Sequence, residues 1–192
     1  MSNDYSNIQV TNTREKFSQD ENIQKNQWLL ERQLHWISNG DIKIGAIVTL
    51  NLALLAGLAK YFHKEGPILL DILYVITTIS ILIGLVFCKV GFRPHLSAPN
   101  QSNIFFGTIA SKDLTSFSNE INDLDKEIYN RDLAEQIHVN ALISKKKYSN
   151  LSNATITLLI TSCLWSVTLG ITLFTEKYTI SKVSTVIPTE NK

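Results

Sequence analysis

The sequence lacks the residue patterns that mark disulfide-bonded domains and nucleic-acid-binding proteins. It contains only two cysteines, Cys88 and Cys163, and both lie in apolar segments. Neither a disulfide framework nor a cysteine metal site is therefore indicated. The formal net charge is only +1, which gives no reason to expect a nucleic-acid partner.

Motifs for phosphate binding and catalysis are also missing. The chain has neither a GxxxxGK(S/T) nor a GxGxxG loop, and its histidines lack the spacing of an HExxH metal site. Glu135 and His138 lie three residues apart, a spacing that a solvated helix face explains without any reaction. We therefore expect no catalytic site, no metal and no cofactor, so that the protein is not an enzyme.

Charge is absent from three long stretches, residues 44–59, 72–88 and 149–175. A helix rises about 1.5 Å per residue and a bilayer core is about 30 Å thick, so about 20 residues are needed to cross it. Lys43 and Lys60 flank the first stretch and can extend their ammonium groups to the interface, which makes it long enough. The pattern predicts transmembrane helices over residues 42–62, 68–88 and 151–174.

The first two predicted spans are joined by the short segment 63–67 and form a helical hairpin. The alternative is a pair of buried helices in a soluble domain. Two adjacent spans separated by a tight turn leave little else in the chain to bury them, so we favour a membrane protein in contact with the lipid bilayer.

The N-terminal region precedes the first span. We expect residues 1–19 to be a disordered tail rather than a cleavable signal peptide, because they are polar and patternless. Ser18 and Glu21 have capping-box spacing, which predicts an amphipathic cytosolic helix over residues 20–41. Its apolar positions are Ile23, Leu30, Leu34 and Ile37, with Trp28 and Trp36 beside them and Lys25, Asn26 and Gln33 opposite.

Two features of this N-terminal helix are left open by the sequence. It either lies on the membrane surface or packs against other cytosolic helices, and we favour packing. Asn39 and Gly40 either interrupt it or lie within one unbroken helix that reaches Phe62, since a single glycine costs a helix only about 1 kcal/mol.

Residues 89–150 are predicted to be a cytosolic helical region. Residues 91–102 are rich in glycine, proline and other helix-breaking residues, so we expect a loop there. We expect the apolar run 103–110, which is too short to span a bilayer, to be a β-strand or a packed extended segment. A short helix should cover residues 113–122, capped by Ser111 or Asp113. A long helix should cover residues 124–149 and continue into the third span. Its packing seam is expected at Ala134, Ile137, Ala141, Ser144, Tyr148 and Leu151.

Polar side chains recur inside the predicted spans. Asn51 lies near the middle of the first span, and an amide in lipid prefers a protein partner. The third span carries a row of hydroxyls that includes Thr161 and Ser162, and hydroxyls can bond to their own helix without lining a channel. Helix packing is the plainer interpretation of these three residues. A part in forming a membrane lesion is the alternative.

Lysine and arginine positions predict the topology. Lys89 and Arg93 follow the second span, and residues 145–147 are lysines that precede the third. The positive-inside rule then places the N-terminus and residues 89–150 in the cytoplasm, with residues 175–192 as a non-cytosolic tail. The predicted fold class is an all-α membrane protein. It has three transmembrane helices, an amphipathic N-terminal helix, and a cytosolic helical region between spans two and three.

Three stretches, in order around these spans, carry a resemblance to a known family. They are Trp36-Ile-Ser-Asn-Gly-Asp41-Ile-Lys43-Ile-Gly45, then Phe105-Phe106-Gly107-Thr-Ile-Ala110, then residues 134–151 with their Lys147-Tyr148 pair. Together they resemble the Pycsar transmembrane effectors (PycTM) over about residues 22–174.

The resemblance implies an antiphage role in the bacterial plasma (inner) membrane. It also implies that a neighbouring cyclase makes cyclic CMP or cyclic UMP on infection. The effector would sense this activating ligand and compromise the inner membrane, so that infection is aborted. Assembly of several copies into a homo-oligomer is a route to such a lesion.

Such a ligand would be small and anionic. Its phosphate suits arginine or lysine, and its base suits an aromatic face with a few hydrogen bonds. The candidate ligand-binding residues are Trp36, Asp41, Lys43 and Arg131, which we expect to converge near the membrane face. Each also has a purely structural interpretation, as an interfacial tryptophan, a helix cap, a snorkelling lysine and a solvated arginine.

Two other functions fit the same pattern of spans. One is a structural or scaffolding membrane protein whose cytosolic helices bind partner proteins. The other is a constitutive, holin-like pore, which would be toxic on expression alone.

Overall fold

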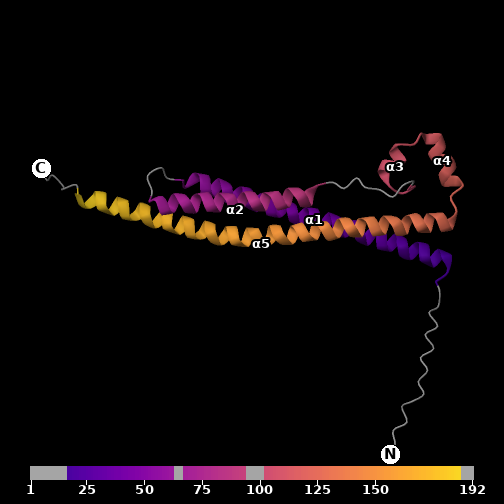
Figure 1. Ribbon diagram of the computed structural model, residues 1–192, viewed down its shortest axis with the longest axis horizontal. Coiled ribbons are helices and arrows are strands. Elements are labelled where there is room, and N and C mark those ends of the chain that lie inside the picture. Colours follow the sequence, from indigo (N-terminus) through magenta and orange to yellow (C-terminus); the bar gives the residue numbers. More distant parts are fainter. Residues whose placement is uncertain (1–16, 63–66, 94–101, 187–192) are drawn as a thin grey trace, which may run out of the picture. The chain divides into compact units, whose positions relative to one another are not determined.

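The computed structural model describes residues 17–62, 67–93 and 102–186, and within these ranges the protein is all-helical, without a strand (Figure 1). The helices are α1 (Gln19–Lys60), α2 (Ile68–Phe92), α3 (Phe106–Ala110), α4 (Leu114–Asn122) and α5 (Lys126–Val186). Helices α1, α2 and α5 are each long and apolar enough to cross a membrane. The predicted fold class, all-α with three such helices, is confirmed.

The chain divides into two compact units. Unit 1 contains residues up to Leu30 and from Ala98 to Ile137, and unit 2 contains Glu31–Ser97 and His138–Lys192. Helices α1 and α5 contribute residues to both units without a break. The predicted N-terminal tail up to residue 16 and the predicted turn at 63–66 lie outside the described residues.

The first turn of α1 in unit 1 has the predicted capping box. The Glu21 N–H donates to Ser18 Oγ over 3.3 Å, and the Ser18 N–H donates to Glu21 Oε2 over 2.7 Å. Both hydrogen bonds satisfy donors that a helix start otherwise leaves without partners. Hydrogen bonding from the Ser18 backbone, and to a lesser extent from the Ser18 side chain, also lowers the pKa of the Glu21 carboxyl.

The N-terminal part of α1 packs against the start of α5, which is one of the two arrangements the sequence left open. Asn26 Nδ2 donates to Asn130 Oδ1 over 2.8 Å, and Lys126 Nζ lies 2.8 Å from Asp20 Oδ1. The predicted faces of this helix were partly wrong. Asn26, assigned to the polar face, is half-buried in the contact, whereas Leu34, assigned to the apolar face, is exposed.

The expectation of a strand or extended segment over residues 103–110 was wrong, because α3 occupies most of it. Ser102 fixes the chain just before this helix, where its Oγ accepts hydrogen bonds from the N–H groups of Ile104 and Phe105. The next helix, α4, has the predicted cap at Asp113, whose carboxylate accepts the N–H groups of Thr115 and Ser116.

Unit 2 is a bundle of α1, α2 and α5, which lie along one another in Figure 1. Its apolar core has two clusters of buried side chains. They are Ile44, Ile47, Cys88, Leu151 and Ala154 in one cluster, and Leu58, Leu70, Tyr74 and Ile81 in the other. Many other apolar side chains on these helices are exposed, as expected where lipid replaces water as the solvent.

Hydroxyl groups join α2 to α5 within the bundle. Three pairs contact each other: Tyr74 with Thr172 at 3.1 Å, Thr77 with Thr168 at 3.2 Å, and Ser80 with Thr161 at 2.6 Å. Trp165 of α5 contacts α1 instead, where its Nε1 donates to the Leu54 carbonyl over 3.0 Å. The predicted row of hydroxyls on the third span therefore faces protein at these positions.

Several predicted boundaries differ from the helices. Helix α1 continues through Asn39 and Gly40 without interruption. Gly91, assigned to a loop, lies in α2 and is buried, because its missing side chain leaves room for Ile44. Helix α5 continues past Phe174. The predicted seam on α5 was wrong at Ala134, which is exposed, and the buried residues there are Leu133 and Gln136.

Candidate functional site

Unit 1 contains a polar cavity of about 600 Å³, which we call the unit 1 pocket. Its volume lies within the range of about 300–1,000 Å³ that is usual for small-molecule sites. Its walls come from the segment before α3, from α3 and α4, and from one face of α5. The lining residues are Ser102, Asn103, Thr108, Lys112, Glu120, Ile128, Arg131, Asp132 and Glu135.

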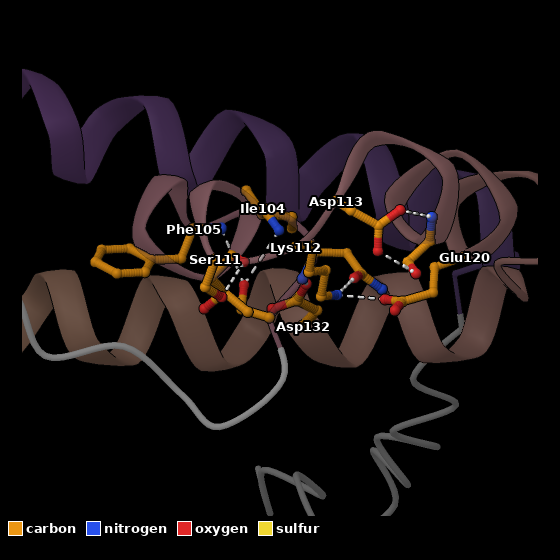
Figure 2. A network of polar contacts seen from close by, with 11 residues as sticks. Ile104, Phe105, Ser111, Lys112, Asp113, Glu120 and Asp132 are labelled. Carbon is orange, nitrogen blue, oxygen red and sulfur yellow. Dashed lines mark hydrogen bonds and ion pairs between the residues drawn. The ribbon is translucent and has the colours of Figure 1, made fainter.

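Hydrogen bonds attach the segment before α3 to helix α5. Gln136 Nε2 donates to Ser102 Oγ over 2.9 Å, and both residues are buried. The Asn103 N–H donates to Asp132 Oδ2 over 2.7 Å. Figure 2 shows this network beside the start of α3. The pocket wall is therefore held by side chains whose own hydrogen bonds fix their positions.

Lys112 connects the pocket wall to α4. Its ammonium group donates to Asn103 Oδ1 over 2.8 Å and forms an ion pair with Glu120 (Figure 2). The lysine side chain is mostly buried, at 18% exposure, whereas that of Glu120 is 46% exposed. Lys112 thus has protein partners already, and its charge is largely balanced within the wall.

Arg131 is the other cation of the pocket and is held much less tightly. Its side chain is 73% exposed, and its Nε lies 4.0 Å from Glu135 Oε1, beyond hydrogen-bonding distance. The neighbouring Asp132 has an Oδ1 atom that is buried without a hydrogen-bond partner among the described residues. The lining therefore combines one exposed arginine with a carboxylate oxygen, Asp132 Oδ1, that accepts no hydrogen bond from the described residues.

The other three candidate ligand residues lie together in unit 2, around Lys147 and Tyr148 of α5. Asp41 forms an ion pair with Lys147. The Tyr148 hydroxyl donates to the Trp36 carbonyl over 3.3 Å, with the two rings 5.7 Å apart, and Lys43 Nζ lies 5.8 Å from the Tyr148 ring centre. The structure thus brings Trp36, Asp41 and Lys43 together, and gives Arg131 a place in the unit 1 pocket.

Lys147 was not among the predicted site residues, although it joins all three helices of unit 2. It is 5% exposed, and besides Asp41 of α1 it contacts the Gly91 carbonyl of α2 over 3.2 Å. The sequence signal was present in the Lys147-Tyr148 pair of the third resembling stretch. The run of three lysines instead suggested only a topology signal, and nothing in it distinguishes the buried lysine from Lys145 and Lys146.

The three residues considered for packing or lesion formation lie within the unit 2 bundle. Asn51 is fully buried; its Nδ2 donates to the Ile47 carbonyl over 2.9 Å, and its Oδ1 has no partner among the described residues. Thr161 is buried against Ser80, and the half-buried Ser162 bonds to Leu158 of its own helix. All three are therefore buried or half-buried between the helices of unit 2.

The chain is similar to known proteins over most of its length. The sequence model of the Pycsar effector protein domain, PycTM, matches residues 26–174. The chain belongs to the PycTM family. This PycTM effector is 26% identical over 165 residues to the Pycsar effector protein GmPycTM of Gulbenkiania mobilis, in a match that covers 70% of this chain and 84% of that protein. No solved structure matches it.

Membership of the PycTM family places the three apolar helices in a biological context. A Pycsar effector with helices suited to crossing a bilayer is a membrane effector of antiviral defence. The match includes both the Arg131 region of the unit 1 pocket and the Asp41–Lys147 pair of unit 2, since it extends from residue 26 to residue 174.

Proposed function

We propose that this PycTM effector senses a cyclic pyrimidine nucleotide, cyclic CMP or cyclic UMP, and then impairs the integrity of the bacterial inner membrane. The observation that carries the proposal is the continuity of α1 and α5. Each helix has residues both in the unit with the polar pocket and in the unit with the apolar spans. An arrangement of these helices favoured by a ligand in unit 1 is therefore passed along the same helices into the bilayer.

The ligand must bind one of two states of the protein more tightly than the other. A ligand shifts a two-state equilibrium only through its difference in affinity for the two states. A change from 1:99 to 99:1 needs about 5.5 kcal/mol of such a difference. One charge-assisted contact and several hydrogen bonds in a small pocket supply energy of this order.

In the proposed orientation the N-terminus and unit 1 face the cytoplasm, where a cyclase would release the nucleotide. Lys89 and Lys145 are exposed on the segments that adjoin unit 1 in sequence, as the positive-inside rule requires. The tail after α5 is then on the opposite side of the membrane.

Polar groups inside the bundle are the proposed source of the lesion. Asn51 Oδ1 has no hydrogen-bond partner among the described residues, and an unsatisfied amide oxygen inside a membrane bundle is unfavourable. Association of several copies, with Asn51, Thr161 and Ser162 repacked between them, supplies partners and gathers polar side chains in one place. The lesion is therefore proposed to form in a homo-oligomer.

The test is dye release from vesicles of phosphatidylethanolamine and phosphatidylglycerol that contain the purified full-length protein. Nucleotide is present on both sides, so that protein of either orientation responds. We expect release with cyclic CMP or cyclic UMP, and none with cyclic AMP or cyclic GMP. Release without any nucleotide would instead identify a constitutive pore, and no release under any condition would favour a scaffolding protein.

A matched pair of variants tests the lesion itself. Asn51→Ala should abolish nucleotide-dependent release, because it removes the buried amide. Thr49→Val should retain release, because Thr49 is exposed on the same helix and bonds only to the Gly45 carbonyl. Equal release from the two variants would remove Asn51 from the proposed mechanism.

A further inference from the structure

The unit 1 pocket has an unusual balance of charge for a site that takes an anion. Two cations, Lys112 and Arg131, line it together with three carboxylates, those of Glu120, Asp132 and Glu135. An ionised carboxylate only accepts hydrogen bonds. The lining therefore suits a ligand with one anionic group and several N–H or O–H donors.

We propose that the unit 1 pocket is the nucleotide site and that its carboxylates select cyclic CMP over cyclic UMP. The inference rests on the proposed function, because the ligand class comes from there. It adds the location of the site, the residue that holds the phosphate, and the base that is preferred.

Arg131 is the phosphate anchor. Its side chain is 73% exposed and its Nε lies 4.0 Å from Glu135 Oε1, so the guanidinium has several N–H donors to offer in the fork geometry that matches a phosphate. Lys112 is not the anchor, since its ammonium group is used by Asn103 and Glu120. One cation with a largely exposed side chain matches the single negative charge of a cyclic monophosphate.

The carboxylates of Glu120 and Glu135 are the acceptors for the ligand. Their side chains are 46% and 50% exposed, so both can reach a small molecule in the cavity. A ribose 2′-hydroxyl is a donor for one of them. Asp132 instead stabilises the pocket wall, because its Oδ2 accepts the Asn103 N–H and its Oδ1 is buried.

Base selection follows from the second carboxylate. Cytosine carries an exocyclic amino group with two N–H donors, and glutamate or aspartate is its usual partner in nucleic-acid recognition. Uracil carries a carbonyl oxygen at the same position. This oxygen and the carboxylate are both acceptors, so no hydrogen bond forms between them. Cyclic UMP therefore lacks one hydrogen bond to a charged group, which is worth about 1.5–3 kcal/mol, enough for a preference of roughly tenfold or more.

The experiment is isothermal titration of the full-length protein in detergent with cyclic CMP and with cyclic UMP. We expect the wild type to bind cyclic CMP at least tenfold more tightly. Arg131→Gln should weaken cyclic CMP binding at least tenfold. At least one of Glu120→Gln and Glu135→Gln should bring the dissociation constants of the two nucleotides closer together, because a glutamine amide offers donors to the uracil carbonyl.

Two control variants accompany these. Lys145→Gln removes an exposed cation of α5 outside the pocket and should leave binding unchanged. Lys43→Gln changes a residue beside Tyr148 in unit 2 and should also retain tight binding of cyclic CMP. Thermal unfolding of each variant shows that it is folded, and Arg131 is exposed enough for its replacement to be tolerated.

The outcomes separate the inference from the function on which it rests. Unchanged binding by Arg131→Gln, or loss of binding in Lys43→Gln alone, would remove the site from the unit 1 pocket while leaving nucleotide sensing intact. Equal or tighter binding of cyclic UMP would overturn the selection by carboxylates. Failure of the wild type to bind either nucleotide would contradict the proposed function itself.

Discussion

The buried ammonium group of Lys147 on α5 is paired with the carboxylate of Asp41 on α1. The lysine is 5% exposed, and it also donates to the carbonyl oxygen of Gly91 on α2. A buried charge is tolerated only when it is paired and hydrogen-bonded. One side chain therefore holds together the three helices of unit 2 near one end of the apolar spans.

Asp41→Asn is expected to destabilise the protein by about 1–3 kcal/mol, because it leaves the Lys147 ammonium buried without its counter-charge. The midpoint of thermal unfolding in detergent should fall. Adding Lys147→Met to this variant should recover part of the loss, since it removes the unpaired charge. Strictly additive losses in the double variant would contradict the interaction, and Lys145→Met is the exposed control.

Gly57→Ala is expected to lower stability by about 1–3 kcal/mol through overpacking. A methyl group at Gly57 would lie 3.0 Å from Cζ2 of Trp165, whose indole is already held by its hydrogen bond to Leu54. Gly45→Ala is the matched control on the same helix, because a methyl group there meets nothing within 4 Å. A similar loss in both variants, measured by thermal unfolding, would show that the Trp165 contact is not responsible.

Thr168→Val is expected to cost only about 0.6 kcal/mol, the average for hydrogen bonds between helices in lipid. Thr168 is buried and contacts the Thr77 hydroxyl across the α2–α5 interface. Thr49→Val serves as the exposed control. Reversible unfolding in mixed micelles measures both values, and a loss of several kcal/mol at Thr168 would mean that the contact is much stronger than the geometry implies.

Acid should disorder the start of α4. Hydrogen bonds from the Ser116 side chain and backbone, and from the Thr115 backbone, lower the pKa of the Asp113 carboxyl from its ordinary value of 3.8. Because the folded-state pKa is the lower one, this cap stabilises the fold above the unfolded pKa. The stabilisation is lost as the pH falls through the folded-state value.

The amide chemical shifts of Thr115 and Ser116 should report this titration with a midpoint below 3.8. Asp113→Asn should abolish the transition while preserving a capping oxygen. A midpoint at or above the ordinary value would show that the capping hydrogen bonds do not persist in solution.

The long helices were predictable because a chain in lipid must satisfy its backbone groups internally, and charge-free runs then indicate helices. The helix caps at Ser18 and Asp113 were also predictable, because each depends on residues no more than three positions away in sequence. The segment at Phe106–Ala110 was not predictable, since a short apolar run shows no period that separates strand from helix. Gly91 suggested a loop, whereas its place in the helix depends on Ile44 from another part of the chain.

The candidate site was less predictable than the fold, because its contacts join residues far apart in sequence. Arg131 was selected by its charge, but the pocket around it depends on Ser102 and Asn103 reaching α5. Asp41 and Lys147 are likewise separated by most of the chain. No spacing rule within one helix reveals such pairs.

The threonine hydroxyls between α2 and α5 have one further property. Thr77, Thr168 and Thr172 each also contact a carbonyl four residues earlier in their own helix, at 2.7–2.8 Å. When the two helices separate, the hydroxyl protons of these three threonines keep their local acceptors and are not left unpaired in hydrocarbon. At these three positions, separation of α2 from α5 therefore costs no hydrogen bond of either helix, and the contact favours a bundle whose helices repack without unfolding.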